Sequence, residues 1–122
     1  MNEKLSANIS LKEAIFSATA QRLGIDNTPN TTQMRNMAQT ATNLFEPLRA
    51  GLGNRPIHIS SFFRGEMLNR AVGGAKNSQH VSGEAMDLDT DGFPDSPTNL
   101  EIFNYIKDNM DFDQLLYEFP DE

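Results

Sequence analysis

The sequence contains no cysteine and no tryptophan, and histidine occurs at only two of its 122 positions. Without cysteine, the chain can form neither disulfide bonds nor thiolate zinc sites, and it has no cysteine nucleophile. Any transition-metal site in this chain must therefore be built from imidazole and carboxylate groups.

Positive charge is also scarce, since 10 Lys and Arg residues face 17 Asp and Glu residues, for a net charge of −7. Neither nucleic acid nor an anionic membrane surface attracts such an acidic chain, so neither is expected as a partner. No apolar run approaches the ~18 residues of a membrane span, and the start "MNEKLSANIS" lacks the apolar core of a signal peptide. We therefore expect a soluble chain made in the cytoplasm without a signal peptide. Its oligomeric state is left open.

The length and the hydrophobic content of 38% predict one domain, residues 1–122, with one modest core. Ser10 and Glu13 form a capping-box pattern that predicts a helix over residues 11–23, ended by Gly24. A turn-rich loop, "GIDNTPNTT", follows.

A second helix is predicted to begin at Thr31 or Thr32 and to end at Gly51 and Gly53. Pro47 should bend or break it, because proline lacks a backbone donor. Its inward positions at helical spacing are expected to be Met34, Met37, Ala41, Leu44, Leu48 and Leu52.

The second half of the chain is rich in strand formers. Strands are predicted over residues 57–61, in "EAMDLD" and over residues 112–119, with a short helix in "RGEMLNRAVGG". A capping box at Thr98 and Glu101 predicts another helix, whose inward residues should be Leu100, Phe103, Ile106 and Met110. Helices first and short strands later indicate an α+β fold.

The segment "NSQHVSGEAMDLDTDG", residues 77–92, carries aspartates at every second position from Asp87. Together with Gly92 they match the opening of an EF-hand calcium loop. The remainder fails, because Thr98 stands where a bidentate glutamate is needed and two prolines interrupt the segment. We interpret Asp89 and Asp91 as a strand end that runs into a solvated acidic turn.

His80 and Asp87 differ from this ladder. Gly83 and the small Ala85 indicate a sharp turn that then enters a tightly packed strand, so both side chains could point at one spot. Imidazole plus carboxylate is a partial zinc set, since catalytic zinc normally has three protein ligands and one open position. From spacing alone, a hydrogen-bonded surface or core histidine is the favoured interpretation, and zinc is the alternative.

The pattern Ser-x-His-x-x-Gly-x-Ala-x-Asp over residues 78–87 resembles the signature of the zinc D-Ala-D-Ala carboxypeptidase family, which includes L-Ala-D-Glu peptidases of phage endolysins. "PIHISSFFRGEMLNRAVGGAKNSQH", "GIDNTP" and "LFEPLRAGLG" are also similar to segments of that family. The resemblance implies a hedgehog/DD-peptidase-like fold with N-terminal helices packed on a small, mainly antiparallel sheet. It also implies zinc-dependent hydrolysis of a D-Ala-D-Ala or L-Ala-D-Glu type bond in peptidoglycan stem peptides.

The same resemblance implies roles for single residues. His80 and Asp87 match the first two zinc ligands, and Arg64 matches an arginine that holds substrate or stabilises a developing oxyanion. A surface ion pair is the alternative for Arg64. A phage lytic enzyme released to the cell wall, a virion peptidase and a cytoplasmic recycling enzyme all fit a chain without an export signal.

The chain departs from the family pattern at its end, because the third zinc ligand of the family, a histidine near the C-terminus, has no counterpart here. His58 lies in a strand and is interpreted as structural. Three explanations stay open: a C-terminal truncation, substitution by a carboxylate such as Glu118, or a non-catalytic descendant that binds cell-wall peptide or a protein. Glu118 is also the best local candidate for the general base. A calcium-stabilised binding domain is a third hypothesis.

Overall fold

The computed structural model describes residues 3–74, 78–110 and 117–118 of the chain. It contains six α-helices, one π-helical segment (η1) and five short strands in this described part, which confirms the α+β class. In chain order the elements are β1 (Lys4–Ser6), β2 (Ile9–Ser10), α1 (Leu11–Ile15), α2 (Ala18–Leu23), α3 (Thr31–Thr40), η1 (Ala41–Phe45), α4 (Glu46–Gly51), β3 (Ile59–Ser61), α5 (Glu66–Ala71), β4 (Met86–Leu88), α6 (Asn99–Asn109) and β5 (Tyr117–Glu118).

The helix predicted over residues 11–23 is two helices. Ser10 caps the first, since its hydroxyl accepts a hydrogen bond from the Glu13 N–H at 3.0 Å. Phe16 is extended and ends α1, and Ser17 then caps α2 by accepting from the Ala20 N–H at 3.1 Å. A serine favours a cap over a helix interior, because its hydroxyl binds nearby backbone groups. The prediction of one continuous helix was therefore wrong.

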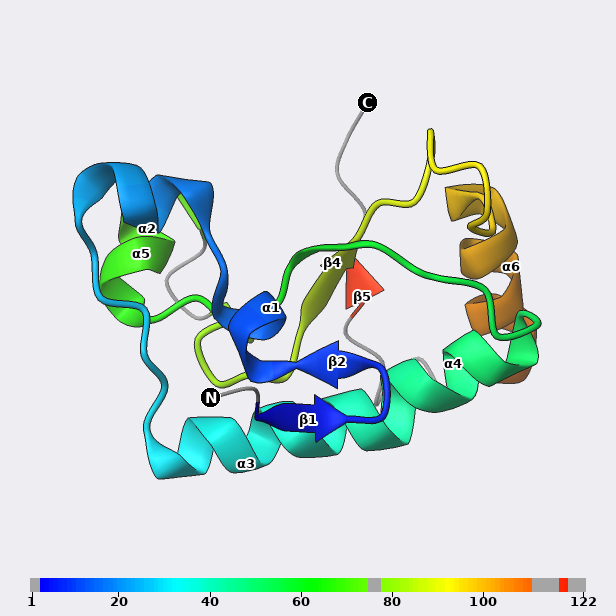
Figure 1. Cartoon of the computed structure of the whole chain (residues 1–122), viewed down its shortest axis with the longest axis horizontal. Helices are drawn as coiled ribbons and strands as arrows, with labels where there is room; N and C mark the ends of the chain where they lie inside the picture. Colours follow the sequence, from blue (N-terminus) through cyan, green and yellow to red (C-terminus); the bar gives the residue numbers. More distant parts are fainter. Residues whose placement is uncertain (1–2, 75–77, 111–116, 119–122) are drawn as a thin grey trace.

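The long helix does not break at Pro47, which lies in the first turn of α4. The distortion occurs one turn earlier, in η1, where the Glu46 N–H donates to Ala41 O across five residues. A wider π turn accommodates the missing proline donor and its bulky ring. As a result α3, η1 and α4 form one rod, which runs from cyan to teal along the base of the molecule (Figure 1).

The predicted central strands are present but shorter. β3 pairs antiparallel with β4, and β4 pairs parallel with β5. The strand predicted over residues 112–119 is described only at Tyr117 and Glu118, and the remaining positions lie outside the described residues. A small antiparallel hairpin, β1–β2, was not predicted.

The core lies between the long helix and the β3–β4 pair. Ile102 and Ile106 are the buried residues of α6, whereas Leu100 is 68% exposed and Phe103 is 46% exposed. The prediction that Leu100 and Phe103 face inward was therefore wrong. The buried cluster contains Ile9, Ala14, Met37, Ala41, Phe45, Leu48, Ile57, Ile59, Phe62, Phe63, Met86, Leu88, Ile102 and Ile106.

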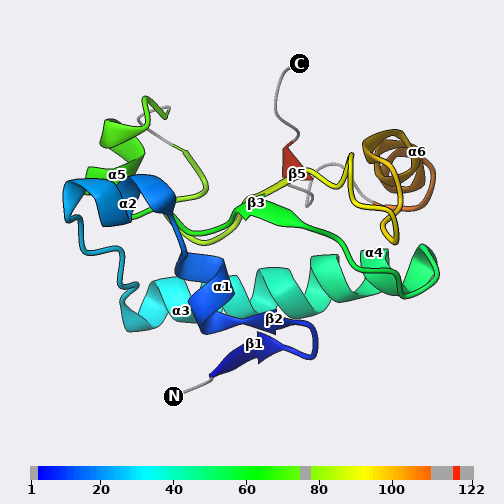
Figure 2. The same cartoon turned by 45° about the horizontal axis from the view of Figure 1, so that its top comes forward.

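Helices α2 and α5 lie at the opposite end of the molecule from α6. Figures 1 and 2 both place α2 beside α5 at one end and α6 beside α4 at the other, with β3 and β4 between them. No helix in the described ranges is long and apolar enough to cross a membrane.

Candidate metal centre

The segment between His80 and Asp87 makes a turn before it enters β4. Gly83 has a φ of +82°, a conformation that glycine adopts without steric cost. Ala85 follows and is only 1% exposed, and Met86 then starts β4. The turn and the close packing predicted for this segment are thus both observed.

Helix α3 holds this turn through polar side chains. The carboxamides of Gln33 and Asn36 donate to Val81 O and Ser82 O, each at 3.0 Å. The hydroxyl of Thr40, one turn further along, donates to the O of the next residue, Gly83, at 2.9 Å. Three successive carbonyl groups are thereby fixed to one helix.

Gly83 also permits the helix to come close. A Cβ at this position would lie 2.5 Å from the Met37 Cγ and 2.9 Å from the backbone O of Gln33. Backbone atoms cannot move aside as a flexible side chain can, so a side chain at residue 83 would push the turn away from α3.

His80 and Asp87 meet at the end of this turn. His80 is fully buried, and its Nε2 lies 3.1 Å from the Asp87 Oδ1. Its other nitrogen, Nδ1, lies 2.7 Å from the carbonyl O of Phe62, a group that can only accept. In the neutral ring the proton is therefore on Nδ1, and the Nε2 lone pair faces the carboxylate. A carbonyl that orients a histidine in this way is typical of a metal ligand.

The surroundings of His80 shift the pKa of its ring upward. Burial by itself lowers the pKa of His80, but the hydrogen bonds to Asp87 and to Phe62 O and the Asp87 charge outweigh it, so the pKa is raised. A metal ion on this pair would therefore compete with a proton. Within the described residues, no group of three or more His, Asp and Glu side chains could hold a metal ion.

Arg64 lies in the segment that follows β3. Its backbone N–H donates to His80 O at 3.2 Å, and its Nε is buried without a hydrogen-bond partner among the described residues. It belongs to a pocket of about 290 Å³. The pocket is lined by Phe16, Ser17, Ala18, Thr19, Ser60, Ser61, Phe63, Arg64 and Val72.

The two remaining predicted positions lie apart from each other. The backbone register sets Glu118 on β5 opposite Asp87 on β4. His58 is exposed, precedes β3 and stacks on Phe93 with ring centroids 4.8 Å apart. That contact agrees with a structural interpretation of His58.

The family model for Peptidase M15 matches residues 7–120. The chain belongs to the Peptidase M15 family. This M15 chain is also 42% identical over 43 residues to a zinc D-Ala-D-Ala carboxypeptidase of Streptomyces albus G, a match that covers 35% of this chain and 17% of that protein. No solved structure matches.

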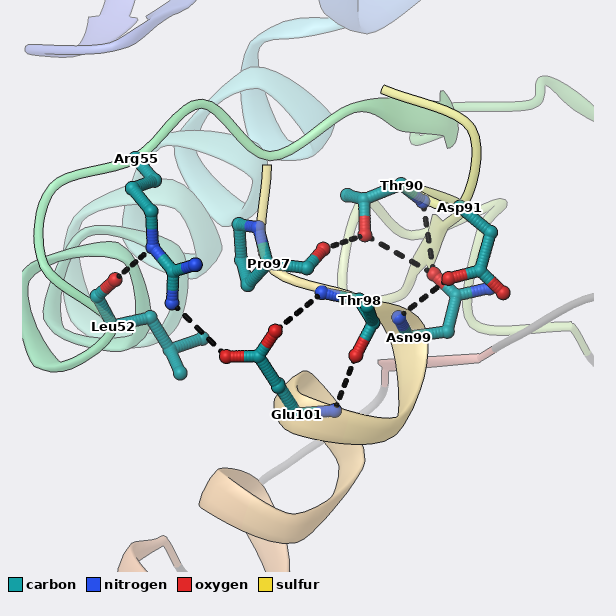
Figure 3. A network of polar contacts seen from close by, with 8 residues as sticks. All are labelled: Leu52, Arg55, Thr90, Asp91, Pro97, Thr98, Asn99 and Glu101. Atoms are coloured by element: carbon teal, nitrogen blue, oxygen red, sulfur yellow. Dashed lines mark hydrogen bonds and ion pairs between the residues drawn. The ribbon is translucent and has the colours of Figure 1, made fainter. Parts of the chain in front are cut away.

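Two further aspartates of this M15 chain, Asp89 and Asp91, hold the start of α6. Asp91 Oδ1 accepts from the Asn99 N–H at 2.9 Å (Figure 3). Asp89 Oδ1 accepts from the Asn99 carboxamide at 3.2 Å. Asn99 Oδ1 in turn accepts from the Thr90 N–H at 2.9 Å, and the Thr90 hydroxyl donates to Pro97 O. Asp91 is exposed and Asp89 is half-buried, so the turn is solvated at Asp91, and each carboxylate also accepts a hydrogen bond from Asn99.

Sequence reasoning missed the polar residues of α3 that hold the His80 turn. Gln33, Asn36 and Thr40 recur at spacings of three and four and therefore form a polar row along the helix. Such a row beside an apolar stripe signals a buried polar contact, but the sequence does not tell which segment is bound.

Proposed function

We propose that this chain is a zinc-dependent peptidase domain that acts on peptidoglycan stem peptides, with His80 and Asp87 as two of its zinc ligands. One observation carries the proposal. A fully buried histidine presents its Nε2 to a carboxylate oxygen 3.1 Å away, while a backbone carbonyl holds its Nδ1. Membership of the Peptidase M15 family supports the same conclusion.

The donor set fits zinc. One imidazole nitrogen and one carboxylate oxygen are ordinary zinc ligands, and both converge without thiolate help. Bound zinc supplies a Lewis acid that polarises a carbonyl and makes a water molecule nucleophilic near neutral pH. The protein contributes rigidity, because Phe62 O fixes the ring of His80 and α3 fixes the turn that follows it.

Arg64 is proposed to bind the substrate. Its guanidinium is permanently charged, and its Nε has no hydrogen-bond partner in the described part of the chain. The pocket it shares with Ser60 and Ser61 is open to a peptide carboxylate or carbonyl oxygen. The charge would stabilise negative charge that develops on the substrate oxygen.

Glu118 is proposed as the general base. Its support is the parallel register that sets its backbone opposite Asp87. A carboxylate at this position would take a proton from the attacking water and pass it to the leaving amine. The third zinc ligand is proposed to lie outside the described residues.

The scissile bond that we propose is of the D-Ala-D-Ala type, and the alternative is a bond of the L-Ala-D-Glu type. The order follows from the relative whose name is zinc D-Ala-D-Ala carboxypeptidase. Delivery to the cell wall as a phage-type lytic enzyme belongs to the same proposal and follows from the resemblance alone.

The test is zinc content and zinc affinity, measured for the wild-type chain, for His80→Ala and for His58→Ala. His58 is the matched control, because it is an exposed histidine stacked on Phe93. About one zinc per chain is expected in the wild type and in His58→Ala, with a loss in His80→Ala. Cleavage of synthetic D-Ala-D-Ala and L-Ala-D-Glu peptides is measured next.

The outcomes separate the candidate functions. Zinc binding with cleavage of either peptide supports the peptidase. Zinc binding without cleavage supports a non-catalytic binding domain. Equal zinc binding in wild type and His80→Ala, or no zinc binding in any of the three proteins, contradicts the proposed site.

A further inference from the structure

The segment that carries Arg64 has little regular structure of its own. Residues 62–65 connect β3 to α5 and belong to neither element. Tertiary hydrogen bonds hold its backbone instead: the Phe63 N–H donates to Ala14 O at 3.1 Å, and the Arg64 N–H donates to His80 O at 3.2 Å. The direction of the Arg64 side chain therefore depends on partners from distant parts of the sequence.

Asn27 supplies the contacts on either side of Arg64. Its carboxamide nitrogen donates to Phe63 O at 3.0 Å, and its carboxamide oxygen accepts from the Gly65 N–H at 2.8 Å. The same nitrogen donates to Ile15 O at 2.9 Å, at the end of α1. Asn27 comes from the loop between α2 and α3 and is only 9% exposed.

This arrangement requires a carboxamide. The two carbonyl groups need donors and the Gly65 N–H needs an acceptor, and asparagine offers both within one short, planar group. An aspartate of the same shape would keep the acceptor but turn a charge toward the carbonyl oxygens of Phe63 and Ile15. Asn27 is buried and shields the two carbonyl groups and the Gly65 N–H from water. A hydrogen bond that Asn27 can no longer make would therefore not be replaced by one to water.

We propose that Asn27 is a positioning residue for Arg64. It positions Arg64 by holding the backbone of Phe63 and Gly65, the residues on either side. The proposal rests on the substrate-binding role proposed for Arg64. Beyond that role, the proposal assigns a function to the loop between α2 and α3, in which Asn27 lies. Because Asn27 also binds the end of α1, it sets Arg64 relative to Phe16 and Ser17, which line the same pocket.

The first test does not depend on catalysis. NMR relaxation of the Arg64 Nε–H is measured in the wild-type chain, in Asn27→Asp and in Asn104→Asp. Asn104 is an exposed asparagine of α6, so it controls for the added charge. In Asn27→Asp the Arg64 order parameter should fall from the rigid range, about 0.85, toward about 0.6 or below. It should stay unchanged in Asn104→Asp.

The second test uses peptide cleavage and zinc affinity. Asn27→Asp should lower kcat/KM by about 10- to 100-fold, since a small misplacement of a binding group has effects of that size. Zinc affinity should fall much less than kcat/KM, because Asn27 contacts neither His80 nor Asp87 and is linked to His80 through the backbone of the Arg64 segment. In an Arg64→Ala background, Asn27→Asp should cause little further loss, because the residue it positions is gone.

An unchanged order parameter of Arg64 in Asn27→Asp would overturn the proposal, as would an equal loss of kcat/KM with and without Arg64. If the wild-type chain neither binds zinc nor cleaves peptide, the proposed function fails while the relaxation measurement still decides the role of Asn27. If Asn27→Asp does not fold, Asn27→Ser replaces it. Unfolding of both variants would show a general stabilising role and would also overturn the proposal.

Discussion

Two neighbouring regions of this chain carry aspartates, and their carboxylates are used differently. In the first, the His80 turn (residues 80–87), the Asp87 carboxylate lies 3.1 Å from a histidine nitrogen that can bind a cation. In the second, the acidic turn (residues 89–99), the carboxylates of Asp89 and Asp91 accept hydrogen bonds from Asn99. Asp87 and Asp89 are two positions apart in the chain.

The difference shows that a cluster of carboxylates does not by itself make a metal site. The acidic turn joins β4 to α6, and Asp89 and Asp91 each accept a hydrogen bond from Asn99 that fixes the helix start. The His80 turn instead directs two groups at one point and is held from behind by α3. Preorganised ligands, rather than the density of negative charge, distinguish the candidate centre.

The largest difference between the two regions is expected when one glycine in each is replaced by alanine. Gly83→Ala should destabilise the fold by about 2–4 kcal/mol, because a positive φ and a clash with the α3 backbone both contribute. Gly92→Ala should cost only about 1 kcal/mol, since φ is +90° there but no atom lies within 4 Å of the added Cβ. Urea unfolding measures both. Equal losses would mean that the His80 turn is not packed as closely as described.

The next largest effect should be on zinc affinity. Asp87→Asn should weaken zinc binding by about 100-fold, because it removes one of few charged ligands. Asp89→Asn, the matched change in the acidic turn, should leave zinc affinity within about twofold. Calorimetric titration with zinc measures both variants. A loss in Asp89→Asn alone would assign the metal to the acidic turn, and a similar loss in both variants would contradict the separation of the two regions.

Asn99→Ala changes the acidic turn and should leave the His80 turn as it is. It removes the acceptor of the Thr90 N–H and the donor to Asp89, both partly buried, and should destabilise the fold by about 1–3 kcal/mol. Zinc affinity at His80 and Asp87 should not change. Thermal unfolding with and without zinc tests this expectation, and a loss of zinc binding would contradict the independence of the two regions.

The smallest effect concerns Glu101, which completes the cap of α6. Its hydrogen bond from the Thr98 N–H, with Arg55 beside it, lowers the pKa of its carboxyl below 4.5. The stabilisation is therefore present above pH 4.5 and is lost as pH falls through the lower pKa of the folded chain. Glu101→Gln should lower Tm slightly at pH 7, and the difference should shrink as pH falls below the pKa of the folded chain. A difference independent of pH would mean that charge is not its cause.

Local chemistry made much of the fold predictable. The cap at Thr98 and Glu101 appears with both of its hydrogen bonds, and α6 begins at the next residue. Met37, Ala41 and Leu48 are buried at the helical spacing expected of them. Phe103 and Leu100 could not be placed, because the sequence does not show which face of α6 meets α4. The helix break predicted at Pro47 is absent, because the π turn before it accommodates the missing backbone donor.

The sequence by itself determined the candidate ligands, since its composition leaves only imidazole and carboxylate, and one histidine lies seven residues before an aspartate with a glycine between them. Only the tertiary structure decided that these two groups meet, that Phe62 O directs the ring of His80, and that Asn27 holds Arg64. The reason is physical. Ligand type is a property of single side chains, whereas convergence depends on hydrogen bonds between segments apart in the sequence, such as the 18 residues between Phe62 and His80 and the 36 between Asn27 and Phe63.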